Sequence, residues 1–248
     1  MEFGENGAVI KNNDDGTSDI GPTNIHAFPD GPRGLNDLFR WARYALMGYI
    51  AVESLMILVV LFLGWLYLPS TIVPFDMSTL ERIDLGISAI GIALIVTFFG
   101  AAFMVARFTF RAMRNLHTVG SKHADMSPGW AVGWYFIPFA NLFKPAQGMS
   151  QIVHGTRHAI GDVNDTNSGI PLWWTCWLMT NFSQTIADRI VRFSGDTIDT
   201  QTQLVAFAFD GASSTIGIVS AWALIQILRP VADAHEQLRN GGVAQVFD

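Results

Sequence analysis

Two acidic side chains lie within long apolar stretches of the sequence, where charge is rare. Glu53 falls in the first stretch and Asp210 in the last. A carboxylate at membrane depth is costly, so it normally faces protein or water and has a partner. The pair could relay protons or cations. Alternatively, each carboxyl could hydrogen-bond a neighbour such as Ser54, Ser213 or Ser214 and fix helix packing. The sequence leaves both interpretations open.

Histidine spacing supplies a second candidate chemistry, a metal site. His154 and His158 in HGTRH are four residues apart on a predicted helix. That spacing suits two metal ligands, but the segment lacks the glutamate of HExxH and a third ligand fixed by spacing. None of the six histidines lies inside an apolar run, which argues against haem. We therefore predict no metal, no cofactor and no catalytic residue, and we expect only bound lipid as a small-molecule companion.

Two groups of arginines mark the ends of apolar stretches. Arg107, Arg111 and Arg114 follow one another at steps of four and three, which places them on one helical face. Such a stripe commonly meets anionic lipid, or it could grip a neighbouring segment. Arg189 and Arg192 also share a face and could bind lipid headgroups or a partner. The alternative for this second pair is that the charges snorkel to the membrane boundary.

The composition indicates a membrane protein. The chain has 248 residues, of which 50% are apolar and 15% are charged, whereas soluble domains carry about 25% charged residues. The net charge of −6 and the lack of a basic stripe with interleaved aromatics exclude a nucleic-acid partner. The single cysteine, Cys176, excludes an internal disulfide framework.

The apolar residues gather in four runs long enough to cross a bilayer. The expected spans cover about residues 45–68, 83–108, 171–190 and 204–228. A polar N-terminal arm, residues 1–32, precedes this transmembrane domain of residues 33–240, and a short tail, residues 241–248, follows it. Because the arm is rich in Gly, Asn, Asp and Pro without periodicity, we expect it to lack regular structure when it is free.

The basic residues set the orientation, because they stay cytoplasmic near membrane ends. With a cytoplasmic N-terminus and four spans, twelve lie inside and only Arg82, Arg189 and Arg192 lie outside. The inside set is Lys11, Arg33, Arg40, Arg43, Arg107, Arg111, Arg114, Lys122, Lys144, Arg157, Arg229 and Arg239. If residues 127–148 also spanned, the split would fall to ten and five. The sequence therefore favours four spans with both termini in the cytoplasm.

The segment SPGWAVGWYFIPFANLFKPAQG, residues 127–148, then lies between spans two and three. Its apolar run from Pro128 to Phe143 has 16 residues, about 24 Å as a straight helix, which is short for a bilayer. Pro138 should kink or end that helix, while Ser127 and Pro145 suit helix starts. We predict two short helices that meet at an elbow, residues 127–160, embedded from the cytoplasmic side without crossing.

The elbow's side chains support this interfacial position. Trp130 and Trp134 are four residues apart and share one face, as do Phe139 and Phe143. Tryptophan prefers the headgroup level of a membrane. Asn141 could satisfy carbonyls freed by Pro138, or it could face a ligand.

The element PGWAVGWYFIPFANLFKP, preceded by Arg114–Asn115–Leu116 and followed by Leu172–Trp173–Trp174, resembles a bacterial integral membrane family, domain of unknown function number 4328. The resemblance covers roughly residues 38–240 and leaves out the N-terminal arm. It implies four membrane helices with a proline- and tryptophan-rich element between the second and third. It implies no activity.

These observations predict an all-α fold, a four-helix membrane bundle with a re-entrant or interfacial elbow, in the bacterial inner membrane. They favour a non-catalytic accessory or scaffold subunit of a larger complex, with the arm and the elbow contacting other membrane-protein subunits. The alternative is a small transporter or channel-like protein that uses Glu53 and Asp210. An enzyme acting on lipid at the elbow has the least support.

Overall fold

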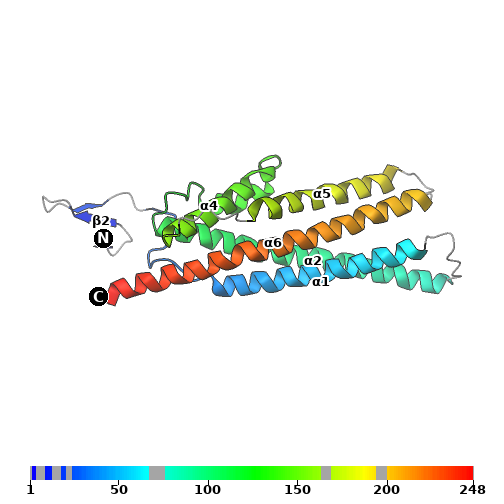
Figure 1. The fold of residues 1–248 in the computed structure, drawn as a ribbon, viewed down its shortest axis with the longest axis horizontal. Coiled ribbons are helices and arrows are strands. Elements are labelled where there is room, and N and C mark those ends of the chain that lie inside the picture. The colour runs from blue at the N-terminus through cyan, green and yellow to red at the C-terminus, as the bar shows by residue number, and fades with distance from the viewer. Residues whose placement is uncertain are drawn as a thin grey trace. The chain divides into compact units, whose positions relative to one another are not determined.

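The computed structural model is predominantly helical (Figure 1). It describes residues 2–3, 9–12, 18–20, 24–66, 76–162, 169–193 and 200–247. Four long helices are α1 (Asn36–Leu66), α2 (Met77–Thr118), α5 (Ile170–Phe193) and α6 (Thr200–Phe247). Between α2 and α5 lie α3 (Pro128–Gly133), η1 (Trp134–Phe136), η2 (Ala140–Leu142) and α4 (Lys144–Ala159). The predicted all-α architecture is therefore confirmed for the body of the chain.

The N-terminal arm contains short strands that its sequence did not predict. The strands β1 (Glu2–Phe3), β2 (Val9–Asn12) and β3 (Ser18–Ile20) form an antiparallel sheet in the order β1-β2-β3. Ile10 pairs with both Glu2 and Ile20 at the centre of this sheet. Our expectation of an arm without regular structure was wrong here, because β-branched residues at these positions favour extended pairing.

Three helices are long and apolar enough to cross a membrane among the residues described. They are Asn36–Leu66, Met77–Thr118 and the Thr200–Gly241 part of α6. The apolar windows of the first two are largely exposed, as expected of surfaces that face lipid. Helix α5 has the length of a span but does not reach their apolarity, since Thr, Asn, Ser and Gln follow its tryptophans in the second half of the helix. Residues 67 and 68, the expected end of the first span, lie outside the described residues.

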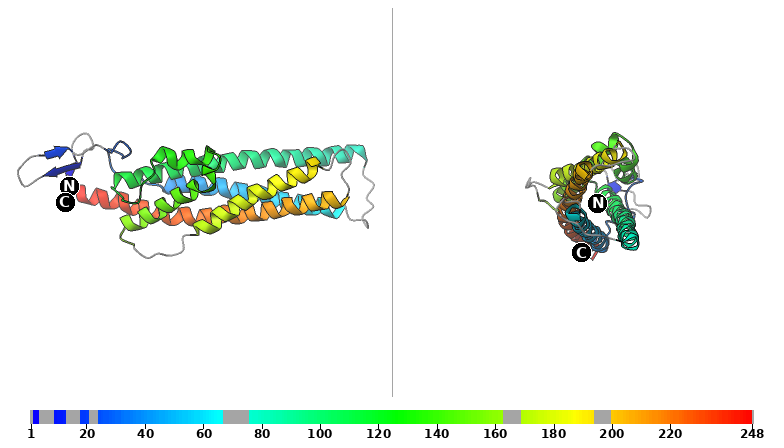
Figure 2. Two further views of the ribbon diagram at one scale, coloured as in Figure 1. Left: turned by 90° about the horizontal axis from the view of Figure 1, so that it is seen from above. Right: turned by 90° about the vertical axis from the view of Figure 1, so that its right-hand side faces the viewer.

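Two compact units make up the chain. Unit 1 comprises residues 1–40, 105–168 and 227–248, and unit 2 comprises residues 41–104 and 169–226. In unit 2 the middle parts of α1, α2, α5 and α6 run side by side (Figures 1 and 2). Their contacts include hydrogen bonds from Ser213 to the Thr180 carbonyl and from Ser220 to the Trp173 carbonyl, each 3.2 Å. Helix α6 does not end at Pro230 but continues beyond it to Phe247.

Unit 1 is built from the ends of α2 and α6 and from α4, which lie side by side (Figure 2). Leu116 and Ile152 are fully buried on α2 and α4. Gly155 lets α4 approach closely, because a Cβ there would lie 2.9 Å from Cδ1 of Leu116. The core of this unit therefore depends on a small residue at one helix crossing.

Candidate functional site

The elbow has the two helical arms that the prolines predicted. Ser127 caps α3, with its Oγ accepting from the Trp130 N–H at 3.4 Å. Pro145 occupies the first turn of α4, where its missing N–H costs nothing. The Trp130 and Trp134 rings lie 4.7 Å apart between centroids, which confirms that they share a face.

Pro138 ends the first arm in a strained turn. Ile137 before it is extended, as pre-proline residues tend to be. The Ala140 N–H donates to the Pro138 carbonyl at 2.8 Å, and the residue between them, Phe139, has φ 62° and ψ −46°. These are features of a γ-turn of the rare positive-φ kind. A bulky residue in this conformation is a strain that surrounding structure must support.

The elbow exposes several large aromatic side chains, one of them on this turn. Phe136 is 82% exposed, Phe139 84%, Phe143 64% and Trp130 51%. We call these four residues the aromatic patch. Large exposed apolar patches mark contacts with membranes or partner proteins.

Around Pro138 the main chain satisfies its own carbonyls. The Trp134 carbonyl, which a helical N–H at position 138 would have reached, accepts from the Ile137 N–H at 3.5 Å, and the Ile137 carbonyl accepts from the Asn141 N–H at 2.9 Å. The side-chain Oδ1 of Asn141 is buried, and within the described part of the chain it accepts no hydrogen bond.

Beside the elbow, unit 1 contains a buried polar cluster that was not predicted from the sequence. His235 on α6 is fully buried; its Nδ1 lies 3.1 Å from Nδ2 of Asn115, and its Nε2 lies 3.0 Å from Oγ1 of Thr156. Asn115 also binds the main chain of Arg33, accepting its N–H at 2.9 Å and donating to its carbonyl at 2.6 Å. One amide therefore joins α2, α6 and the segment before α1.

That segment is held on α2 through Phe28. The Phe28 ring lies between two guanidinium groups, with Cζ of Arg33 at 4.3 Å and Cζ of Arg114 at 4.2 Å from its centroid. The Phe28 N–H donates to Thr118 Oγ1 at 2.8 Å, and Arg114 donates to the Ala27 carbonyl at 3.3 Å. Arg114 thus contacts the chain's own N-terminal segment at Ala27 and Phe28.

The other arginines of the stripe remain at the surface. Arg107 is exposed, and Arg111 is partly exposed. Burial, followed by the nearby charges of Arg107 and Arg33, lowers the pKa of Arg111, while Asp37 acts in the opposite direction. The cluster is therefore positive overall and suits anionic groups.

The histidines predicted on α4 are engaged in local contacts. His154 Nδ1 lies 2.8 Å from the Ser150 carbonyl, and the ring of His158 lies 5.2 Å from that of His123. Among the described residues no group of three or more His, Cys, Asp or Glu side chains could hold a metal ion.

In unit 2, Glu53 is buried, with 2% of its surface exposed. The Tyr49 hydroxyl, one turn earlier on α1, hydrogen-bonds its carboxylate. A Cβ on Gly217 of α6 would lie 3.0 Å from the Tyr49 hydroxyl and 3.6 Å from Glu53 Oε1. Helix α6 therefore covers the carboxyl at a position where only glycine fits without movement.

The remaining charged candidates of unit 2 are more accessible. Asp210 is partly exposed and lies two turns before Gly217 on the same face of α6. Arg189 and Arg192 are exposed near the end of α5.

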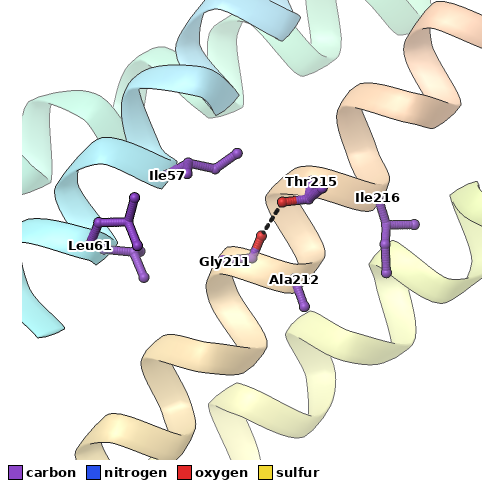
Figure 3. A pocket seen from close by; sticks show the side chains of 7 residues that line it. Ile57, Leu61, Gly211, Ala212, Thr215 and Ile216 are labelled. Carbon is purple, nitrogen blue, oxygen red and sulfur yellow. Dashed lines mark hydrogen bonds between the residues drawn. The ribbon is translucent and has the colours of Figure 1, made fainter.

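An apolar groove begins one turn beyond Glu53 (Figure 3). Its volume is about 390 Å³. Ile57, Val60 and Leu61 of α1 line one side, and Gly211, Ala212, Thr215 and Ile216 of α6 line the other. The Thr215 hydroxyl donates to the Gly211 carbonyl, so the groove has almost no free polar group. Its chemistry suits an acyl chain.

Three residues of these sites, His235, Tyr49 and Gly217, were not predicted because little in the sequence marks them. His235 lies in a polar helical tail, where a histidine normally faces water. Tyr49 and Gly217 are common residues of apolar helices. Gly217 can be linked to Glu53 only once α1 is known to pack against α6. The position of Tyr49 one turn before Glu53 was the one usable signal.

The three helices that are long and apolar enough to cross a membrane indicate a class, that of multi-pass helical membrane proteins. The chain belongs to the family described as Domain of unknown function (DUF4328), which matches residues 74–233. The resemblance predicted from the sequence is thereby confirmed, over a shorter range than expected. No curated protein and no solved structure matches the chain.

Proposed function

We propose that this protein is a non-catalytic accessory or scaffold subunit of a larger complex in the bacterial inner membrane. In this proposal α1, α2, α5 and α6 all span the bilayer, with both termini in the cytoplasm. The elbow is embedded in the cytoplasmic leaflet and presents the aromatic patch to a partner subunit.

One observation carries the proposal: the elbow exposes the aromatic patch, and one of its rings lies on a turn whose backbone is strained. Phe139 is 84% exposed at φ 62°, so its position costs free energy and gains no internal packing. Exposed aromatics of this kind are enriched in the cores of protein interfaces. Burial of these rings against a partner or in the membrane interface would offset the free-energy cost of the strained turn.

The polar groups of unit 1 support a structural role. Asn115, Thr156 and His235 are bound to one another inside the unit. This arrangement favours a rigid support for the aromatic patch.

The test is affinity purification of the full chain from its native membrane in mild detergent. We expect a partner protein to co-purify in a fixed ratio, and a photo-crosslinking residue at Phe136 to capture the same protein. The double variant Phe136→Ser/Phe139→Ser should lose the partner. Ile25→Ser is the matched control, since Ile25 is 82% exposed in unit 1 outside the elbow.

Two results would refute the scaffold proposal. One is a chain that purifies alone and monomeric under conditions that preserve other complexes of the same membrane. The other is crosslinking from Phe136 to lipid only.

A further inference from the structure

Arginine side chains of unit 1 gather where α2 leaves its apolar run. Arg107 lies in the last turn of the run at 83–108, and Arg111 follows one turn later on the same face of α2. Phe110 is exposed beside them. Basic and aromatic residues at the end of an apolar helix lie at the level of the lipid headgroups.

A third arginine reaches the same place from the segment before α1. The main chain of Arg33 is held by the Asn115 side chain of α2, which accepts its N–H at 2.9 Å and donates to its carbonyl at 2.6 Å. The charges of Arg107 and Arg33 both act on the guanidinium of Arg111. Bonds to the main chain therefore fix Arg33 on α2, with its charge close to that of Arg111.

The carboxylates beside these arginines do not balance their charge. The Asp37 carboxylate also acts on Arg111, but it pairs with Arg40 at 3.2 Å. Asp30 lies 3.8 Å from Arg33, and both side chains are exposed, so this pair contributes little. Arg111 is partly buried, where a cation requires a counter-charge. An anion from outside the chain would supply it.

We propose that Arg33, Arg107 and Arg111 bind the phosphate group of an anionic phospholipid. A guanidinium presents paired N–H donors that match two phosphate oxygens. A lipid is the source of the phosphate because the arginines follow an apolar helix at headgroup level, where anionic lipids attract basic residues. On α1, Trp41 directly follows Arg40 and is exposed, as is usual at this level. The proposal is independent of the scaffold function and needs only that α2 spans a bilayer.

The test measures lipid binding to the purified full chain by native mass spectrometry in detergent. The protein is freed of its native lipid and titrated with phosphatidylglycerol or with phosphatidylcholine of the same acyl chains. Both lipids carry a phosphate, but only phosphatidylglycerol has a net negative charge. We expect one phosphatidylglycerol to bind about tenfold more tightly than phosphatidylcholine.

Three glutamine variants locate the site. Arg33→Gln and Arg111→Gln should each weaken phosphatidylglycerol binding about tenfold, the usual effect of losing one bond to a charged group. The bonds to Asn115 use only the main chain of residue 33, so Arg33→Gln keeps the segment in place and tests the proposal even if Arg111→Gln does not fold. Arg229→Gln is the matched control, since Arg229 is exposed just after the apolar run of α6 and its substitution removes the same charge. It should leave phosphatidylglycerol binding unchanged.

Three outcomes would overturn the assignment. Equal affinity for the two lipids would show that the net charge of the lipid is not recognised. Equal weakening in Arg111→Gln and Arg229→Gln would reduce the effect to a general attraction between basic residues and anionic lipid. Displacement of the lipid by inorganic phosphate would identify a soluble phosphate compound as the ligand.

Discussion

His235 is a buried imidazole whose charged form the fold disfavours. Burial lowers its pKa from 6.5 to about 4. It lies beyond the apolar run that ends at Leu228, and both ring nitrogens contact neutral groups. In the unfolded chain the imidazole titrates near its ordinary value. Between the two values the unfolded state binds a proton that the folded state does not, so stability decreases as pH falls.

We therefore expect the free energy of unfolding to fall by about 3 kcal/mol between roughly pH 6.5 and pH 4. The measurement is the denaturation midpoint of the purified chain over that pH range. His235→Gln should lower stability at neutral pH and remove this part of the slope. The same slope in both proteins would assign the pH dependence to other groups.

Among single residues, Glu53 could be identified from the sequence, but most of its structural neighbours could not. A carboxyl inside an apolar run is visible from composition, because such residues are rare. Tyr49, one turn earlier on the same helix, was visible from the sequence, whereas Gly217 was not, since helix pairing brings it to Glu53. The same reasoning explains why His235 was missed.

Among the elements, the elbow shows how a short turn can position large rings. Phe139 is the central residue of the γ-turn, and glycine adopts its φ of 62° without a steric penalty. We expect Phe139→Gly to raise stability by about 1 kcal/mol through relief of this strain. Partner recovery in the affinity purification should decrease, because a ring of the aromatic patch is lost.

Thermal unfolding in detergent gives the first quantity, and the partner-to-bait ratio gives the second. Phe143→Gly is the comparison, since Phe143 is exposed in the same patch but has negative φ. It should weaken partner recovery without the gain in stability. A loss of stability in Phe139→Gly would contradict the strain argument.

The packing of α1 against α6 gives a second prediction at this scale. A side chain on Gly217 would meet the Tyr49 hydroxyl at 3.0 Å. We expect Gly217→Leu to destabilise the protein by about 2 kcal/mol, within the usual cost of overpacking. Gly91→Leu should be close to neutral, because no atom lies within 4 Å of a Cβ there. Equal unfolding temperatures for the two variants would show that α6 does not cover Glu53 closely.

The helices themselves followed from the length and apolarity of the runs, with ends that differ by several residues. The run at 83–108 became α2 over Met77–Thr118, because polar helical residues continue the backbone hydrogen bonds past the apolar part. The arm was misjudged, since its strand pairing joins residues whose low-complexity surroundings indicate a loop. Apolar periodicity predicts long helices better than it predicts short strands.

For the whole molecule, the proposed topology gives a direct prediction. In a Cys176→Ser background, single cysteines replace Ser78, Lys144 and Gln237, of which Ser78 and Gln237 are exposed. We expect a membrane-impermeant maleimide added to the periplasmic side to label position 78 alone. Positions 144 and 237 should react only after the membrane is permeabilised. Labelling of position 144 from the periplasm would show that the elbow crosses.

Asn115 recognises residue 33 through main-chain atoms alone. Every amino acid except proline offers the same N–H and carbonyl, so this anchor tolerates drift in side-chain identity. Substitution of Arg33 would therefore leave the main-chain bonds to Asn115 in place and remove the guanidinium from one face of Phe28, so that Arg114 alone would still stack on that ring.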